Sequence, residues 1–470
     1  MIFKMELKSI YMKKIFIITA ICLMFYKCNS TKPEPRGPNV HKPISDQSLA
    51  SGVIYEANIR QYSSEGTFNA FTKDLPKIKE LGVNVIWLMP TYPISSTKSK
   101  GPLGSYYAIS DYKGVNPEFG TLKDLKNLIY NAHQMGMYVI FDWVPGHTGW
   151  DHVWVKDHPE YYLKNENGKI IDPIDPRTGE SFGWTDVADL DYNQPQMRAA
   201  MKDAMLYWIK EFDIDGYRVD QAYAVPFDFL EDVFKSIRKI KPVFIMGELE
   251  QDSGKNSYLP LFDGSYDFPG YELNVEIAQG HKTVIDYLNH IDDFVLDHDD
   301  SHFLLNFVST HDKNAWNGTA RERFGDAQHA IMASNYLLPG LPLLYSGVEY
   351  DLDKRLLFFE KDSFPKLAGE TYKLLKKLGD LKKKHPSLNS GKVPGSFNII
   401  QTSLREKVLA FERVKKSDTI VFIANLSKDH IGFTSIYNGQ FKRFQDEKIK
   451  KLSFSYEYRM QPWEFWILTK

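Results

Sequence analysis

Short apolar runs alternate with amphipathic helical segments along most of this chain, and no other feature of the sequence constrains its fold as strongly. The apolar runs are Val53–Ile59, Val83–Pro90, Met137–Trp143, Gly216–Asp220, Val243–Glu248, Ser265–Phe268, Phe303–Ser309 and Pro342–Gly347. The helices predicted between them are Phe68–Leu81, Leu122–Met135, Gln194–Phe212, Phe227–Ile240 and Asp326–Leu338. Strands that alternate with helices in this way form parallel sheets of βα units. The eight repeats predict an α/β fold, a (β/α)8 TIM barrel over residues 51–143 and 194–386, with a doubly wound sheet as the alternative.

Two further domains are predicted from segments that break this pattern. Residues 144–193 separate the third strand from its helix and are rich in Trp, Tyr, Asp, Pro and Gly, which indicates an inserted domain. On a barrel such a long insertion rises from the face where active sites are built. From about residue 387 the hydrophobic period changes to two, in the runs Lys407–Val414, Thr419–Asn425 and Lys451–Tyr458. Residues 387–470 are therefore predicted to form a C-terminal antiparallel β-sandwich.

The N-terminus has the pattern of an export segment. Lysines precede the apolar run Ile15–Tyr26, so residues 1–27 are predicted to be a signal peptide. The run has 12 residues and a bilayer needs about 20, which makes a transmembrane anchor the weaker interpretation. Both cysteines, Cys22 and Cys28, lie here, and a Cys28 followed by the polar linker 28–50 resembles a bacterial lipoprotein. We expect an exported protein of the periplasm or outer membrane, lipid-anchored through Cys28, with a simple secreted form as the alternative.

Composition excludes several classes of protein. A hydrophobic content of 43% with 25% charged residues excludes a largely disordered chain. The formal net charge of −2 becomes more negative when the predicted signal peptide is removed, so no nucleic-acid partner is expected. The lysine-rich run 373–384 carries leucines at helical spacing, which indicates the solvated face of an amphipathic helix.

Acidic side chains follow four of the predicted strands: Asp142, Asp220, Glu248 and Asp312. Active sites of barrels lie at the carboxyl ends of their strands, so we expect these carboxylates to share one rim. Arg218 and Asp220 lie on the same side of one strand, where the guanidinium can keep the carboxylate ionised. Glu248 follows an apolar strand that can raise its pKa, as a general acid requires. Two carboxylates in opposed environments fit retaining glycoside hydrolysis, and a structural Arg218–Asp220 ion pair is the alternative.

Four motifs in this order resemble the four sequence regions of the α-amylase family, glycoside hydrolase family 13. They are Asp142-Trp-Val-Pro-Gly-His147, Gly216-Tyr-Arg-Val-Asp220, Gly247-Glu248 and His311-Asp312. The resemblance implies the barrel, inserted domain and C-terminal β-sandwich that the patterns also predict. It further implies Asp220 as nucleophile, Glu248 as acid/base and Asp312 as the carboxylate that holds the sugar hydroxyls. The substrate-binding residues that it implies are Asp142, His147, Arg218, His311 and Tyr107, the last as the ring stacked under the sugar. Tyr107 as an ordinary packing ring is the alternative.

The function implied by the resemblance is retaining hydrolysis of α-glucosidic, mainly α-1,4, bonds in starch, glycogen or maltodextrins. In retaining enzymes the two carboxyl groups lie about 5–5.5 Å apart. The alternatives are an α-glucosidase, an α-1,6-acting enzyme or a glucanotransferase of the same family, and a noncatalytic α-glucan-binding lipoprotein. The expected partner in every case is an α-glucan.

Three positions depart from the family pattern. Gly146 stands where the family often has a calcium-binding Asn, Gln221 begins a segment without the usual Lys-His pair, and Leu249 replaces a frequent Trp. No cofactor is expected for the chemistry. A structural calcium ion is left open, and its available ligands are Asp172, Asp175, Asp186 and Asp189.

Aromatic residues make up 14% of the chain, and sugars stack on such rings. Five tryptophans lie in or near the loops predicted around the mouth of the site: Trp143, Trp150, Trp154, Trp184 and Trp316. We expect about half of them to contact substrate and the rest to fill the core of the inserted domain.

Overall fold

The structure is a computed structural model that describes residues 41–175, 177–249, 257–296, 301–453 and 456–470. The predicted signal peptide 1–27 and Cys28 lie outside the described residues. No helix in the described ranges has the length and apolar character to cross a bilayer.

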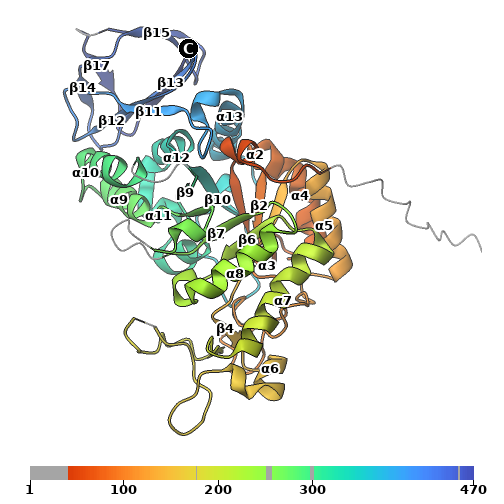
Figure 1. Ribbon diagram of the computed structural model, residues 1–470. Helices are drawn as coiled ribbons and strands as arrows, with labels where there is room; N and C mark the ends of the chain where they lie inside the picture. The colour runs from red at the N-terminus through yellow and green to blue at the C-terminus, as the bar shows by residue number, and fades with distance from the viewer. Residues whose placement is uncertain (1–40, 176, 250–256, 297–300, 454–455) are drawn as a thin grey trace, which may run out of the picture. The chain divides into compact units, whose positions relative to one another are not determined.

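Eight parallel strands close into a barrel with the order β1-β10-β9-β8-β7-β6-β3-β2, which forms the centre of the ribbon in Figure 1. The strands are β1 (Ile54–Ala57), β2 (Val85–Leu88), β3 (Tyr138–Trp143), β6 (Gly216–Val219), β7 (Phe244–Gly247), β8 (Gly264–Tyr266), β9 (Phe303–Phe307) and β10 (Leu341–Tyr345). Each overlaps one predicted run, so the barrel is confirmed and the doubly wound sheet is excluded. Every residue of these strands is buried, as the apolar character of parallel strands requires.

The five predicted helices are confirmed, each to within about two residues. The α-helices of the barrel region are α2 (Asp46–Ala50), α3 (Ile59–Tyr62), α4 (Phe68–Glu80), α5 (Leu122–Gln134), α7 (Pro195–Phe212), α8 (Phe227–Arg238), α9 (Phe268–Gln279), α10 (Val284–His290), α11 (Ala320–Phe324), α12 (Gln328–Leu337) and α13 (Glu370–Lys384). Helix α5 illustrates why the helices could be predicted from the sequence. Thr121 caps its first turn in a capping box with Asp124, and Leu125, Leu128 and Ile129 bury one face.

Short 3₁₀ and π segments connect these elements: η1 (Pro159–Tyr161), η2 (Ala222–Ala224), η3 (Leu259–Leu261), η4 (Ile291–Val295), η5 (Lys313–Asn317), η6 (Gly325–Ala327), η7 (Val348–Tyr350) and η8 (Pro386–Leu388). The insertion after β3 contains β4 (His147–Gly149), antiparallel to β5 (Val187–Asp189), and helix α6 (Val153–Asp157). It begins where β3 ends, so its first strand starts at a residue of the predicted site.

The C-terminal domain contains two antiparallel sheets. The larger has the order β11-β12-β13-β18-β15-β16 and the smaller pairs β14 with β17. Their bounds are β11 (Ser396–Ile399), β12 (Val408–Lys415), β13 (Asp418–Asn425), β14 (Ile431–Phe433), β15 (Gly439–Arg443), β16 (Ile449–Leu452), β17 (Tyr458–Met460) and β18 (Phe465–Thr469). The single strand predicted over Lys451–Tyr458 is wrong. Its two ends belong to different sheets, and the chain leaves one ladder before it joins the other.

The predicted linker 28–50 is wrong at its C-terminal end. Residues Asp46–Ala50 form α2, whose first turn is capped by the Ser45 side chain. Leu49 and Ala50 are buried, because this helix packs on the barrel core. His41 extends the contact, since its ring stacks on His133 with 3.8 Å between ring centroids.

Asp215 precedes β6 and is a buried centre of charge. Its carboxylate accepts hydrogen bonds from His133 Nε2 at 2.8 Å, from Lys241 Nζ at 3.1 Å and from the Val139 amide at 2.9 Å. Burial raises the pKa of Asp215, but hydrogen bonds from His133 and His41 outweigh burial and lower it well below the ordinary value. The charged form is therefore the one that the fold stabilises.

We expect Asp215→Asn to lower the free energy of unfolding by about 3 kcal/mol at pH 7, because it removes the charged acceptor of the donors from His133, His41 and Lys241. A depressed pKa contributes stability above the unfolded value of about 3.9, and that contribution is lost as the pH falls below it. Urea denaturation of wild type and Asp215→Asn at pH 7 and at pH 3 measures the loss of unfolding free energy at each pH. This loss should be smaller at pH 3. Asp228→Asn removes an exposed ion pair with Arg198 and should cost about 0–1 kcal/mol. Equal losses in the two variants would contradict the role of Asp215.

Candidate active site

A cavity of about 400 Å³ opens at the carboxyl ends of the barrel strands. The three predicted catalytic carboxylates, Asp220, Glu248 and Asp312, all line it. They follow β6, β7 and β9, so the closure of the barrel brings together residues that lie far apart in the sequence. Three of the predicted substrate-binding residues also line the cavity: Tyr107, His147 and His311.

Arg218 lies beneath this rim with a side chain that is only 1% exposed. Its Nη1 contacts Asp220 Oδ1 at 2.8 Å and Asp142 Oδ1 at 3.0 Å. Its Nη2 contacts Glu248 Oε2 at 2.9 Å. One guanidinium therefore binds three carboxylates, where the sequence argument paired it with Asp220 alone.

This sharing weakens the effect of Arg218 on the pKa of Asp220. Burial raises its pKa well above the ordinary value, the charges of Glu248 and Asp142 raise it further, and Arg218 lowers it only in part. Arg218 lowers the pKa of Asp220, as the sequence predicts, but its effect is divided among three acidic groups.

Glu248 has polar partners. Its Oε2 accepts hydrogen bonds from the Gln221 amide at 2.9 Å and from Gln221 Nε2 at 3.3 Å, besides the ion pair with Arg218. Gln221 has a left-handed backbone (φ 42°), and this conformation follows the strand end directly. The apolar environment predicted for Glu248 is therefore wrong, since a strand residue's neighbours come from adjacent strands and loops. Gln221, which departs from the family pattern, orients the carboxylate.

Asp142 differs from its predicted position. Its side chain is fully buried and lies below the residues that line the cavity. It accepts hydrogen bonds from Trp87 Nε1 at 3.1 Å and from the Tyr107 hydroxyl at 3.1 Å, and it pairs with Arg218. The structure thus places Asp142 as a support for Tyr107 and Arg218.

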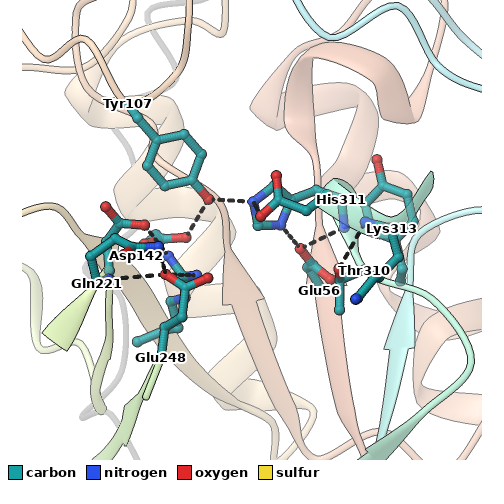
Figure 2. Close-up of polar contacts among 12 residues, drawn as sticks. Glu56, Tyr107, Asp142, Gln221, Glu248, Thr310, His311 and Lys313 are labelled. Atoms are coloured by element: carbon teal, nitrogen blue, oxygen red, sulfur yellow. Dashed lines mark hydrogen bonds and ion pairs between the residues drawn. The ribbon is translucent and has the colours of Figure 1, made fainter. Parts of the chain in front are cut away.

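Tyr107 and His311 form one surface of the cavity. Their rings are stacked with 5.5 Å between centroids and 21° between planes, and the Tyr107 hydroxyl lies 2.9 Å from His311 Nε2. Figure 2 shows this contact as a bridge between Asp142 on one side and Glu56 on the other. Asp312 is 48% exposed, and its Oδ2 lies 3.5 Å from His311 Nε2. Tyr107 therefore lines the cavity and is more than a ring that packs in the core.

Glu56 on β1 was missed by sequence reasoning. Its side chain is fully buried, and its Oε1 lies 2.5 Å from His311 Nδ1. The available signal was a charged residue in the middle of the apolar run Val53–Ile59, where an unpaired carboxylate would be costly.

His147 lies between the barrel and the insertion. Burial lowers its pKa to about 4, so the ring is neutral at pH 7 and can accept as well as donate a hydrogen bond. It meets the ring of Trp184 edge-on at 5.9 Å. Lys100 adds a cation to the same wall, with its Nζ 2.9 Å from Asp186 Oδ1.

The five tryptophans divide between the cavity and the protein core. Trp184 and Trp316 line the cavity, whereas Trp143 is fully buried and Trp154 packs against Tyr112 and Tyr161. Trp150 is half-buried, with Lys98 over its ring. Sequence reasoning missed Phe358 and Phe359, which face Trp316 across 5.4 and 6.0 Å, because nothing in the sequence relates the loop after β10 to the loop after β9.

The four aspartates considered as calcium ligands have other partners. Asp175 pairs with Arg177 at 2.7 Å, Asp186 pairs with Lys100, and Asp172 accepts a hydrogen bond from Ser181. Asp189 accepts from the Ile174 amide, and burial raises its pKa to about 7. Within the described residues no three of these carboxylates converge on one point.

The profile described as "Alpha amylase, catalytic domain" matches residues 45–370, which is well over half of the chain. The chain belongs to the α-amylase family. Among curated relatives, "Alpha-amylase 3" of Dictyoglomus thermophilum is 25% identical over 338 residues, 64% of this chain and 64% of its own length. The chain therefore spans slightly less than two thirds of that relative. A cyclomaltodextrinase of Thermoanaerobacter pseudethanolicus is 25% identical over 82% of this chain and 68% of its own length.

Solved structures of this family of glycoside hydrolases share the fold. A maltogenic α-amylase from Thermotoga neapolitana superposes with a TM-score of 0.80 at 27% identity, covering 90% of this chain and 99% of its own. The superposition therefore covers nearly all of both chains. The α-amylase resemblance drawn from the four motifs is confirmed.

Proposed function

We propose that this member of the α-amylase family is a retaining hydrolase that cleaves α-1,4 bonds in starch, glycogen or maltodextrins. The observation that carries the proposal is that Asp220 and Glu248 contact the two nitrogens of one buried guanidinium at the base of the cavity. Two carboxylates that share one guanidinium are compatible with a double displacement, in which the carboxyl groups lie about 5–5.5 Å apart.

In the proposed reaction Glu248 protonates the glycosidic oxygen while Asp220 attacks the anomeric carbon, and a β-linked glycosyl-enzyme forms. Glu248 then takes a proton from water, which attacks the same carbon and releases Asp220 and an α-anomer. Arg218 contacts both carboxylates in the free protein, so it can offset negative charge on either of them. Asp312, the most exposed of the three carboxylates, would hold the sugar hydroxyls.

The cavity walls support an α-glucan as substrate. Trp184, Trp316, Phe358 and Phe359 give it aromatic surface on more than one side, which suits the apolar faces of glucose rings. Relatives named as an α-amylase, a cyclomaltodextrinase and a maltogenic amylase favour maltodextrin-like substrates. An α-glucosidase, an α-1,6-acting enzyme or a glucanotransferase are the competing outcomes within the family.

Product analysis tests the proposal directly. The protein is incubated with amylose, maltotriose, pullulan and isomaltose, and the products and their first-formed anomer are identified by NMR. We expect hydrolysis of amylose and maltotriose with release of the α-anomer. A β-anomer would overturn the role of Asp220, and activity on isomaltose alone would identify an α-1,6-acting enzyme. Longer oligosaccharides as the main products would identify a glucanotransferase.

Trp184 should bind substrate through its ring, which stacks on Phe182 at 4.4 Å and borders the cavity. We expect Trp184→Ala to raise KM for maltotriose about tenfold, because it removes a stacking surface worth roughly 1 kcal/mol or more. Steady-state kinetics measure the effect. Trp150→Ala, in the same insertion but outside the cavity lining, is the matched control and should leave KM within about twofold. A similar rise in both variants would show that the insertion as a whole is disturbed.

We also propose that the protein is exported and anchored in the periplasm or outer membrane by a lipid on Cys28. The support is the sequence pattern at residues 15–28. We expect the wild-type protein in the membrane fraction of cells and Cys28→Ser in the soluble fraction, as followed by immunoblotting. Membrane association of both forms would contradict the lipid anchor.

A further inference from the structure

Glu56 and His311 form a buried pair that the proposed reaction does not itself require. His311 presents two donors to one carboxylate oxygen, since its Nδ1 lies 2.5 Å and its backbone amide 3.2 Å from Glu56 Oε1. Glu56 Oε2 has no hydrogen-bond donor among the described residues. The imidazole is therefore the nearest counter-charge of a carboxylate that is fully buried inside β1.

The hydrogen bonds around His311 indicate where its protons are. An ionised carboxylate only accepts, so Nδ1 carries a proton toward Glu56. The Tyr107 hydroxyl has one proton, which it donates to Asp142 Oδ2 at 3.1 Å. It must then accept from His311 Nε2 at 2.9 Å, so Nε2 also carries a proton. With Glu56 and Asp142 both ionised, both ring nitrogens are donors, and the ring is an imidazolium.

We propose that Glu56 is a positioning residue that keeps His311 in its cationic form and aims its Nε2–H at the cavity, beside Tyr107 and Asp312. The pair is visible on the right of Figure 2, where Glu56 lies behind His311 as seen from Tyr107. A neutral His311 would have to lose one of these two hydrogen bonds, and a buried Glu56 would then lack its counter-charge, which is costly.

The charges around His311 favour this form on balance. The charged or titratable groups that face it are Glu56, Tyr107, Asp142, Arg218 and Asp312. Burial lowers the pKa of His311, but the carboxylates of Asp312 and Glu56 outweigh burial and Arg218, and the pKa rises to about 9. His147, which also lines the cavity, has a pKa lowered to about 4 by burial, so the site contains one charged and one neutral imidazole at pH 7.

The consequence for the proposed reaction, on which this part of the inference rests, is a cationic donor at the cavity wall, whose Nε2–H is shared between the Tyr107 hydroxyl and a hydroxyl of the bound sugar. A charged donor bonds a hydroxyl more strongly than a neutral imidazole does, and bonds that strengthen in the transition state accelerate glycoside hydrolysis. Loss of the Glu56 charge should therefore lower kcat more than it raises KM. It should also make His311 lose its proton at a lower pH.

The test measures the titration of His311 in the whole protein, and it does not require the protein to be active. Histidine rings are labelled with ¹³C at Cε1, and the His311 signal is assigned by its loss in His311→Asn. In wild type we expect a midpoint near 9, and in Glu56→Gln a midpoint about one to two pH units lower. The alkaline limb of kcat for maltotriose should move in the same direction, with kcat at pH 7.5 up to about fourfold lower.

Glu349→Gln is the matched control. Glu349 is also fully buried, yet it bonds the Tyr55 hydroxyl at 2.6 Å and lies outside the cavity lining. It should leave the His311 midpoint unchanged even if it destabilises the fold. An equal midpoint in Glu56→Gln and wild type, or an equal shift in Glu349→Gln, would overturn the proposal. If Glu56→Gln does not fold, wild type decides, because a His311 midpoint at or below 6.5 also overturns it. The titration is independent of substrate, so an inactive protein with the expected midpoints would contradict only the proposed function.

Discussion

Asp220→Asn is expected to lower kcat for maltotriose by about 10³–10⁵-fold, because the amide cannot form the glycosyl-enzyme. The protein should remain folded. Asp220 shares one guanidinium with Glu248 and Asp142, and its pKa is raised by burial and by those two charges. Removing its charge relieves repulsion, so we expect the Tm to be unchanged or slightly higher, as at other sites where function opposes stability. Initial-rate kinetics and a thermal melt on the same preparation measure both.

Asp203→Asn is the control for this prediction. Asp203 lies on α7, its side chain is 70% exposed, and it forms an ion pair with Lys113. Its replacement should leave kcat unchanged within about twofold. Hydrolysis by Asp220→Asn at a near wild-type rate, after contamination by a host amylase is excluded, would remove Asp220 from the mechanism.

Glu248→Gln should have an effect that depends on the leaving group. With maltotriose the departing sugar needs a proton, and the loss of the general acid should lower kcat/KM by about 10²–10⁴-fold. With α-maltosyl fluoride the fluoride ion leaves without a proton, so bond cleavage should be far less affected, and deglycosylation should then limit the rate. We expect a burst of fluoride followed by a slow steady state. Stopped-flow fluoride release and maltotriose kinetics give the two values.

Asp220→Asn provides the comparison, since it should lose activity on both substrates by similar factors. Equal losses on maltotriose and on the fluoride in Glu248→Gln would contradict the assignment of Glu248 as general acid. In that variant the Gln221 amide and Nε2 would still find an acceptor in the side-chain oxygen of the introduced amide. The comparison therefore reports on proton transfer, since the position of the side chain is preserved.

Several parts of the site were predictable because strand ends are readable in a sequence. Asp220, Glu248 and Asp312 each follow an apolar run, and the barrel's parallel order brings such positions to one rim. The roles of Glu56 and Asp142 were not predictable in this way. Glu56 and His311 are 255 positions apart in the sequence. Their contact forms because β1 and β9 both flank β10 in the closed barrel.

The charges were harder to predict than the positions. The spacing of Arg218 and Asp220 correctly placed them in contact, but it could not show that Glu248 and Asp142 bind the same guanidinium. A pKa depends on every charge within several ångströms, and most of those charges come from other strands. The predicted strand over Lys451–Tyr458 failed for a related reason, since local alternation does not say which sheet a residue joins.

By itself the amino-acid sequence determined the barrel, the insertion, the C-terminal sheets and the family, because hydrophobic period and motif order are local properties of the chain. Only the tertiary structure decided which side chains share the cavity and which support it from below. It placed Phe358 and Phe359 beside Trp316. It also showed that the Asp142 side chain is buried and does not line the cavity. It also placed the Arg218 guanidinium among three carboxylates and the His311 ring beside Glu56. These arrangements depend on distances between residues remote in sequence, and the closure of the barrel fixes those distances.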